Sequence, residues 1–319
     1  MRFRDPMTAL GRPLSNHPRS LLLPASMPRA GIVTVAGKPN AGKSTLLNRL
    51  IGQKLSIVSS KPQSTRDRIV GIRTVGDTQM VVLDTPGLLH PRYALHRAMR
   101  ATALRALDDA DVIIHLVDGA VGELTSLADA AELIAPPPAP VLTAINKIDV
   151  LGAGARAELA RRAPDAFLIS AVTGDGLDTL LAACAKLLPE SPLLYPEEDL
   201  STQSLRFFAA ELVRETALEQ LEEELPYSIA CEIEEFREQQ VPVYIRAVLH
   251  VERDSQKRIL IGAKGARARS IGQAARAKIE TLVGQRVYLD LWVKVLPNWR
   301  KNAVALRRFG YRLPEESPP

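Results

Sequence analysis

Short apolar runs alternate with longer segments of helical periodicity over the first half of the chain. Five runs have the length and composition of buried strands: residues 31–36, 80–84, 111–118, 141–146 and 166–170. Between them, the apolar residues of segments 44–52, 95–110 and 124–134 have the spacing of helices. Apolar strands that alternate with helices predict a doubly wound α/β domain with a mainly parallel sheet. Residues 69–75 alternate apolar and polar side chains before a Gly-Asp turn, which predicts one antiparallel strand at the edge.

The pattern changes after an acidic, proline-rich stretch at residues 189–204, which we interpret as a linker. The elements expected next are a helix at 204–225, strands at 227–236 and 241–252, helical segments on both sides of 262–265, and a strand at 286–296. In the last strand every second residue is apolar, so one face should be buried and the other wet. We therefore expect an α/β domain at residues 30–188, the linker, a smaller α+β domain at 205–312 and a tail at 313–319.

The first 29 residues contain five arginines, one aspartate and several prolines, without a periodic pattern. Such a composition is typical of a disordered extension. Two alternatives stay open, namely a targeting segment and a true start at Met27, although a continuous apolar stretch and a cleavage site are missing.

Composition limits the classes of function. Of the 319 residues, 46% are hydrophobic, but no apolar run approaches the roughly 20 residues of a membrane span. Cys184 and Cys231 match no metal-binding spacing and are expected to be buried thiols. Residues 206–252 have a charge balance of −7, whereas residues 253–312 have a balance of +12. The basic C-terminal segment points to a polyanionic partner.

A phosphate-binding loop is predicted where the first strand ends. Residues 37–45, GKPNAGKST, fit the pattern G-x-x-x-x-G-K-[ST] between a strand and a helix. Small residues let backbone N–H groups face phosphates, Lys43 supplies a charge to the outer phosphates, and the Ser44 hydroxyl can coordinate Mg²⁺. The expected nucleotide contacts here are Gly37, Asn40, Ala41, Gly42, Lys43, Ser44 and Thr45.

Residues after three further strands complete the predicted site. In LDTPG, residues 83–87, Asp84 can hold Mg²⁺ through water, and the Gly87 amide can meet the terminal phosphate. In NKID, Asp149 can accept both the ring N–H and the amino group of guanine, a pair that adenine does not offer. Further expected contacts to the nucleotide come from Asn146, Lys147, Ser170 and the amide of Ala171. This order of motifs predicts binding of GTP and GDP.

The chain resembles the translation-factor-like GTPases at this point, and the resemblance sharpens on PQSTRDRIVGIRT, residues 62–74. It implies that Thr65, with Ser64 as the alternative, is a second Mg²⁺ ligand that senses the terminal phosphate. Lys43, Thr65, Gly87 and Asn40 are then the expected catalytic residues.

Leu88 stands where Ras-like enzymes carry a glutamine that orients water. Intrinsic hydrolysis should therefore be slow. The resemblance implies that Asn40 holds K⁺ near the phosphates; a catalytic His90 is the weaker alternative.

The basic segment contains a second motif, RILIGAKGARARSIG, in which Gly262 and Gly265 separate two helical segments. This is the KH arrangement for clamping a nucleic-acid backbone, and the order of elements is that of a type II KH fold. The expected RNA contacts are Lys257, Arg258, Gly262, Ala263, Lys264, Gly265, Arg267 and Arg269.

Together the two halves resemble the bacterial ribosome-biogenesis GTPases that carry a C-terminal KH domain, over nearly all of residues 30–312. The resemblance implies a cytoplasmic, monomeric protein that binds the 3′ end of small-subunit ribosomal RNA, assists 30S assembly and associates loosely with the inner membrane face. Two alternatives remain. A membrane or cell-cycle scaffold would need an exposed amphipathic helix, for which residues 298–312 are the candidate, and a tRNA-modifying GTPase would need a reactive cysteine or cofactor site.

Overall fold

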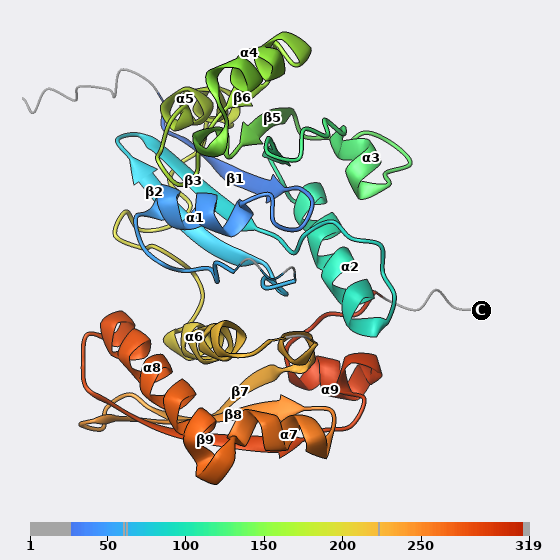
Figure 1. Ribbon diagram of the computed structural model, residues 1–319. Helices are drawn as coiled ribbons and strands as arrows, with labels where there is room; N and C mark the ends of the chain where they lie inside the picture. Colours follow the sequence, from blue (N-terminus) through green and yellow to red (C-terminus); the bar gives the residue numbers. More distant parts are fainter. Residues whose placement is uncertain (1–26, 60, 62, 223, 315–319) are drawn as a thin grey trace, which may run out of the picture.

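The chain folds into two units, each built on its own β-sheet (Figure 1). This computed structural model describes residues 27–59, 61, 63–222 and 224–314. The predicted disordered extension lies outside the described residues up to position 26, and the tail from position 315. Arg29, which we assigned to the extension, instead begins the first strand, and its guanidinium donates to the carbonyl of Leu188 at 2.6 Å.

The first sheet has six strands in the order β2-β3-β1-β4-β5-β6. Their bounds are β1 (Arg29–Ala36), β2 (Ile69–Val75), β3 (Thr78–Asp84), β4 (Val112–Asp118), β5 (Val141–Asn146) and β6 (Phe167–Leu168). All neighbours are parallel except β2 and β3, so the predicted mixed, mainly parallel sheet with one antiparallel edge is confirmed. The carboxyl ends of β1, β3, β4 and β5 therefore meet at one edge, where ligands of such sheets bind.

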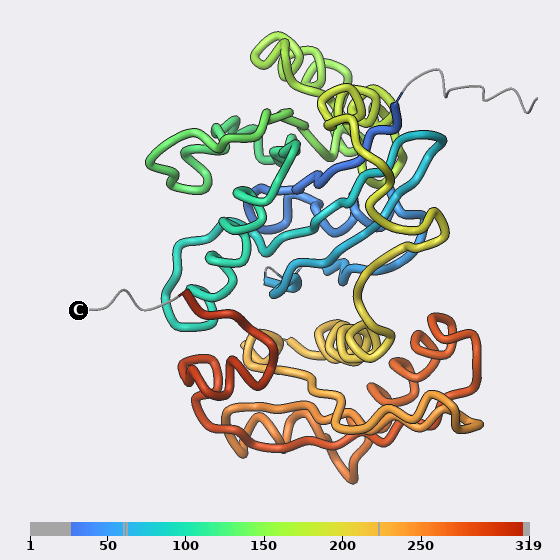
Figure 2. Tube along the Cα trace, turned by 180° about the vertical axis from the view of Figure 1, so that it is seen from behind, coloured from blue at the N-terminus to red at the C-terminus, as the bar shows by residue number. Residues whose placement is uncertain are grey.

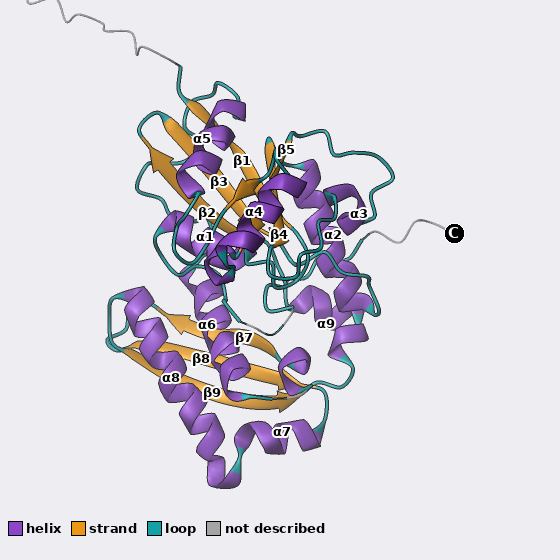
Figure 3. Ribbon diagram, turned by 45° about the horizontal axis from the view of Figure 1, so that its top comes forward, coloured by secondary structure: helices purple, strands orange, loops and turns teal. Residues whose placement is uncertain are grey.

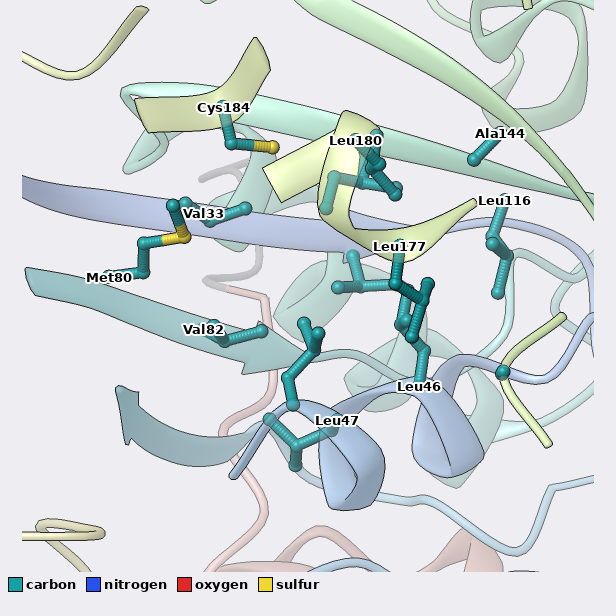
Figure 4. Close-up of a cluster of buried hydrophobic side chains, with 14 of the residues drawn as sticks. Val33, Leu46, Leu47, Met80, Val82, Leu116, Ala144, Leu177, Leu180 and Cys184 are labelled. Carbon is teal, nitrogen blue, oxygen red and sulfur yellow. The ribbon is translucent and has the colours of Figure 1, made fainter. Parts of the chain in front are cut away.

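Helices cover both faces of this sheet. They are α1 (Lys43–Ile51), α2 (Ala94–Asp108), α3 (Leu127–Ala131), α4 (Ala153–Arg162) and α5 (Leu177–Leu187). Leu46 and Leu47 of α1 pack with Leu180 and Cys184 of α5 on the Val33 and Val82 side (Figure 4). Strand residues of opposite alternation, such as Ile113, contact α2 and α3 on the other face.

Several expected bounds in this unit are wrong. The strand expected at 166–170 is shorter, because only the two residues of β6 form a strand. The helix expected at 124–134 ends at Ala131, because the backbone of Glu132 is left-handed, at φ 52°. Helices α4 and α5 were not predicted. The spacing of Leu177, Leu180 and Cys184 was a usable signal for α5.

The second unit is a three-stranded sheet in the order β7-β8-β9, with β7 and β8 antiparallel and β8 and β9 parallel. Its elements are α6 (Leu205–Gln220), β7 (Ala230–Arg237), β8 (Val243–Val251), α7 (Asp254–Ile261), α8 (Ala266–Val283), β9 (Val287–Val295) and α9 (Ala303–Arg308). Helices α6 and α8 cover one face of the sheet (Figure 3). On the other face Tyr288 and Trp292 are exposed, which confirms the predicted alternation of β9.

Helix α6 ends five residues before the bound we expected. Leu221 leaves the helix in an extended conformation and is buried in the second core. Pro226 disfavours helical geometry at the residue before it, and residues 225–228 instead form a 3₁₀ turn.

Helix α6 lies between the two sheets, and the linker reaches it along the side seen in Figure 2. The carboxylate of Glu215 in α6 is fully buried and accepts from Lys54 of the first unit at 2.7 Å and from Lys278 of α8 at 3.1 Å. No helix in the described part of the chain is long and apolar enough to cross a membrane.

Candidate functional site

The loop between β1 and α1 encloses a cavity of about 310 Å³ at the carboxyl edge of the first sheet. Gly42 adopts φ 100°, and a Cβ atom there would lie 2.2 Å from the Asn146 side chain. The loop therefore needs glycine both for its backbone conformation and for its approach to the loop after β5. The predicted residues Asn40, Gly42, Lys43, Ser44 and Thr45 line the cavity, together with Thr65, Gly87 and Lys147.

The ammonium group of Lys43 lies inside the loop. It donates to the carbonyls of Gly37 at 3.1 Å and Lys38 at 2.9 Å. Burial lowers the pKa of Lys43 to about 8, and the nearby charge of Asp84 opposes this shift. A buried cation held by backbone carbonyls at the start of a helix is arranged to meet an anion.

The three residues predicted to bind a metal come together from three separate segments. Asp84 Oδ2 accepts from the hydroxyls of Ser44 at 2.7 Å and Thr65 at 3.3 Å, and these two hydroxyls lie 2.8 Å apart. Sequence analysis missed Ser56, whose hydroxyl also donates to Asp84 Oδ2 at 2.7 Å.

Asp84 is completely buried, and its second oxygen, Oδ1, has no hydrogen-bond partner among the residues that the structure describes. Burial raises the pKa of this carboxyl, while the charge of Lys43 lowers it. An unsatisfied carboxylate oxygen beside two hydroxyls is a donor set that suits a hard divalent cation such as Mg²⁺.

The loops after β5 and β6 form the far end of the site. The Ser170 hydroxyl donates to Asp149 Oδ1 at 2.6 Å and so fixes this carboxylate. Asn146 joins two loops, because its amide donates to the Ala41 carbonyl at 2.8 Å and its oxygen accepts from the Ala171 amide at 2.9 Å. The Ala171 N–H, which we expected near a guanine oxygen, is thus engaged by Asn146.

Lys147 has a left-handed backbone, at φ 67°, and its ammonium group donates to Asp118 Oδ2 at 2.6 Å. Sequence analysis missed Asp118 as a site residue, although its place at the end of β4 was a signal. The ion pair holds the lysine stem along the cavity.

Leu88 turns away from the cavity and packs into the core under α2 and α3, with 3% of its surface exposed. Its N–H donates to the Gly37 carbonyl at 3.0 Å, which fixes Gly87 beside Pro39.

The other two residues considered for hydrolysis lie in different places. The His90 ring is exposed, and its Nδ1 atom lies 3.4 Å from Oε1 of Glu132. Asn40 lines the cavity in a left-handed conformation, at φ 64°.

The segment that carries Thr65 is held by the second unit, a connection that the sequence did not reveal. The guanidinium of Arg66 is 3% exposed and donates to the carbonyls of Ile229 at 2.6 Å, Tyr227 at 3.1 Å and Pro226 at 3.3 Å. Arg214 of α6 donates to the Ser64 carbonyl at 2.5 Å. The loop that contains Thr65 therefore lines the cavity and also contacts the second unit.

We expect Arg66→Met to lower the free energy of unfolding by roughly 2–5 kcal/mol, because three buried carbonyls lose their donor. Urea unfolding of the full chain measures this change. Arg68→Met is the matched control, since Arg68 is only half-buried and its guanidinium pairs with the exposed Asp109 carboxylate at 3.1 Å. Equal stability of the two variants would contradict the assigned role of Arg66.

A second candidate site lies where α7 meets α8. Gly262, Lys264 and Gly265 all have positive φ, at 73°, 49° and 78°, so the backbone makes a tight connection. Beside it is a cavity of about 520 Å³ whose lining includes Gly262, Ala263 and Arg267, and also Gln220, Ile259 and Ser270, which we had not predicted. Of the predicted cations, Arg258, Lys264, Arg267 and Arg269 are exposed and Lys257 is half-buried.

The structure does not favour the two alternative functions, a membrane scaffold and a tRNA-modifying GTPase. In residues 298–312 the apolar side chains Trp299 and Leu306 are fully buried against Leu95 and Met99 of α2. Val304 is exposed, but a single side chain does not form the continuous apolar face that a membrane helix needs. Cys184 is buried, and burial raises its thiol pKa to about 12. Cys231, which we also expected to be buried, is half-buried, but desolvation of its thiol still raises its pKa, so neither thiol is activated.

Comparisons with known proteins match both units of the chain. The family of 50S ribosome-binding GTPases matches residues 32–147, and the KH domain family matches residues 224–300. GTPase Era of Ectopseudomonas mendocina is 44% identical over 299 residues, which cover 90% of this chain and 98% of that protein. GTPase Era of Pseudomonas aeruginosa is 45% identical over 293 residues, covering 89% and 95%.

Two solved structures are also similar, each with a TM-score of 0.83, 39% identity and coverage of 89% of this chain. One is Era in complex with MgGDPNP and nucleotides 1506–1542 of 16S ribosomal RNA, of which 99% is covered. The other is a variant of Aquifex aeolicus Era bound to GDP·AlF4⁻, covered completely.

Proposed function

The chain belongs to the Era family of GTPases, and we propose that it is a GTP-hydrolysing switch that binds the 3′ end of small-subunit ribosomal RNA and assists 30S assembly. The observation that carries this proposal is the pairing of two sites in one chain. Ser44, Thr65 and Asp84 converge beside a phosphate-binding loop, and the glycine connection of the KH domain lies in a basic segment.

In the proposed nucleotide complex Lys43 contacts the outer phosphates, and the backbone amides from Gly37 to Thr45 surround them. The backbone amide of Gly87 contacts the terminal phosphate. Ser44, Thr65 and Asp84 would hold Mg²⁺. When bound, the ion neutralises negative charge on the phosphates. Thr65 and its loop would then respond to the terminal phosphate and pass the change on to the KH domain, because Thr65 lines the cavity and Ser64 beside it accepts a hydrogen bond from Arg214.

Guanine is proposed to bind at Asp149, whose carboxylate accepts two hydrogen bonds from the base. Ser170 orients this carboxylate, and Asn146 joins the loops that contain Ala41 and Ala171. Lys147 covers the base with its stem while Asp118 holds its ammonium group. Ala171 acts through its bond to Asn146.

The KH domain is proposed to clamp about four nucleotides with its glycine connection. Lys257, Arg258, Lys264, Arg267 and Arg269 supply charge to the phosphates, and Gly262, Ala263 and Gly265 allow the backbone to approach. The proposed GTPase domain spans residues 30–188 and the proposed KH domain residues 205–312, joined by the linker at 189–204. We propose a monomer of the cytoplasm that associates peripherally with the inner membrane face.

Hydrolysis is expected to be slow and to depend on a monovalent cation, because Leu88 cannot orient water from the core. We propose that Asn40 contributes an oxygen to bound K⁺. Turnover should be several-fold faster in K⁺ than in Na⁺ at equal ionic strength, and Asn40→Ala should remove the difference while nucleotide binding persists. Phosphate release with Mg²⁺ present measures this, and equal wild-type rates in the two salts would contradict the K⁺ site.

The proposed function is tested by crosslinking the GTP-loaded protein to total cellular RNA and sequencing the bound fragments. The expected result is enrichment of the 3′ end of small-subunit ribosomal RNA. A sample with GDP is the matched control and should give a weaker signal. Enrichment of transfer RNA instead would favour the tRNA-modifying alternative and overturn the proposal.

A further inference from the structure

A large basic groove lies between the two domains, on the side where α9 meets α2 (Figure 1). It encloses about 1090 Å³. Its cationic lining residues come from three segments: Arg97 and Arg105 of α2, Lys301 and Arg307 around α9, and Arg312 of the C-terminal segment. No acidic side chain lines it among the residues that the structure describes.

These cations are available to a ligand. All five side chains are exposed, and none belongs to an ion pair within the described part of the chain. Their neighbours differ in this respect, since Arg100, Arg300 and Arg308 pair with Glu132, Glu252 and Glu232. Burial raises the pKa of Asp67, and the charge of Arg312 opposes this shift without forming an ion pair with the carboxylate. A concave cluster of like charges without counter-ions is costly unless it meets an anion.

The framework under the groove is rigid. Trp299 and Leu306 pack against Leu95 and Met99 of α2, and the Trp299 indole donates to the Ser228 carbonyl at 2.8 Å. The cationic side chains therefore stand on two fixed walls, one from each domain. A ligand that spans the groove contacts both domains at once.

The groove is connected to the start of α7, whereas the glycine connection follows the end of this helix. Arg300, next to Lys301, donates to Glu252 at 2.5 Å just before α7 begins, and Gly262 follows its last residue. Eight helical residues correspond to about 12 Å, and the groove lies beyond the start of this helix, so only an RNA longer than the helix can reach both surfaces. Because a KH domain clamps about four nucleotides, a longer RNA needs a further surface.

We infer that this groove is a second RNA-binding surface, which takes the phosphodiester backbone of the RNA segment adjoining the nucleotides held by the KH domain. This inference rests on the proposed function. Guanidinium groups suit phosphate oxygens through paired hydrogen bonds, and contacts of this kind position an RNA without reading its sequence. An RNA backbone is favoured over an anionic lipid surface, because Ala305 and Leu306 of α9 are buried in the core and the exposed Val304 alone does not make an apolar face that could enter a bilayer.

The test compares two RNAs that end in the same small-subunit 3′ sequence, a short one of about ten nucleotides and a long one of about forty. Arg97→Glu with Arg307→Glu should weaken binding of the long RNA about tenfold or more and leave the short RNA within twofold. The matched control, Arg161→Glu with Arg162→Glu on α4, reverses two exposed charges far from the groove (Figure 1) and should change neither affinity. Fluorescence anisotropy measures all of these affinities.

Arg97→Ala with Arg307→Ala gives a second measurement on the long RNA. Each lost phosphate contact should reduce the slope of log affinity against log salt by about one. An unchanged slope and an unchanged affinity for the long RNA would overturn the inference. Loss of binding to vesicles that contain phosphatidylglycerol, with long-RNA affinity intact, would also overturn it and assign the groove to a membrane. If Gly265→Asp leaves RNA binding intact, it is the proposed KH function that fails, independently of the groove.

Discussion

Asp149→Asn is expected to lower GTP affinity about a thousandfold and to raise affinity for xanthosine triphosphate. The carboxylate accepts two hydrogen bonds from guanine, and hydrogen bonds to a charged group contribute roughly 1.5–3 kcal/mol each. The asparagine amide cannot accept both, but it can donate to the additional carbonyl of xanthine. Competition binding with the two nucleotides in Mg²⁺ measures the change.

The structure indicates that this substitution leaves the fold intact. Asp149 lies in a short 3₁₀ turn, and the Ser170 hydroxyl that donates to its carboxylate can also donate to an asparagine oxygen. Asp165→Asn is the matched control, because Asp165 is exposed in the same domain and its change should affect neither nucleotide. An unchanged preference for GTP in Asp149→Asn would show that the base binds elsewhere.

The sequence was most informative where chemistry depends on neighbouring residues. The phosphate loop, the strand before it and the helix after it are one local unit, so Gly42, Lys43 and Ser44 could be placed from their spacing. The ends of parallel strands meet at one edge of a sheet, and this rule brought Asp84 and Asp149 to the same site. The alternation in β9 was equally local, since successive side chains of a strand point to opposite faces.

Contacts between distant segments could not be predicted in this way. Arg66 appears in the sequence as one more arginine of a polar loop, but its partners lie about 160 positions away and depend on how the two domains pack. Asp118 and Ser56 acquire their roles only when β4 and the loop after α1 come beside the motif residues. The amphipathic pattern of residues 298–312 was visible, but the pattern does not say that α2 covers its apolar side.

Gly265→Asp is expected to remove most of the RNA affinity, roughly a hundredfold. An aspartate at this position places a negative charge where the phosphodiester backbone would lie, and charge repulsion adds to the loss of close backbone approach. Gly265 is a better position than Gly262 for this test. A Cβ atom at Gly265 has no neighbour within 4 Å, whereas one at Gly262 lies 2.9 Å from Arg267 Cβ and would disturb the fold.

The backbone at Gly265 is left-handed, at φ 78°, so any side chain there carries some strain. Asparagine tolerates this conformation and matches aspartate in size, which makes Gly265→Asn the control that separates charge from strain. We expect Gly265→Asn to bind the small-subunit 3′ sequence more weakly than wild type but clearly better than Gly265→Asp. GTP affinity should stay constant in all three proteins, because the glycine connection lies outside the nucleotide cavity. If anisotropy shows the same RNA affinity for Gly265→Asp and wild type, the RNA does not pass over this connection, and the KH domain binds RNA through another surface or not at all.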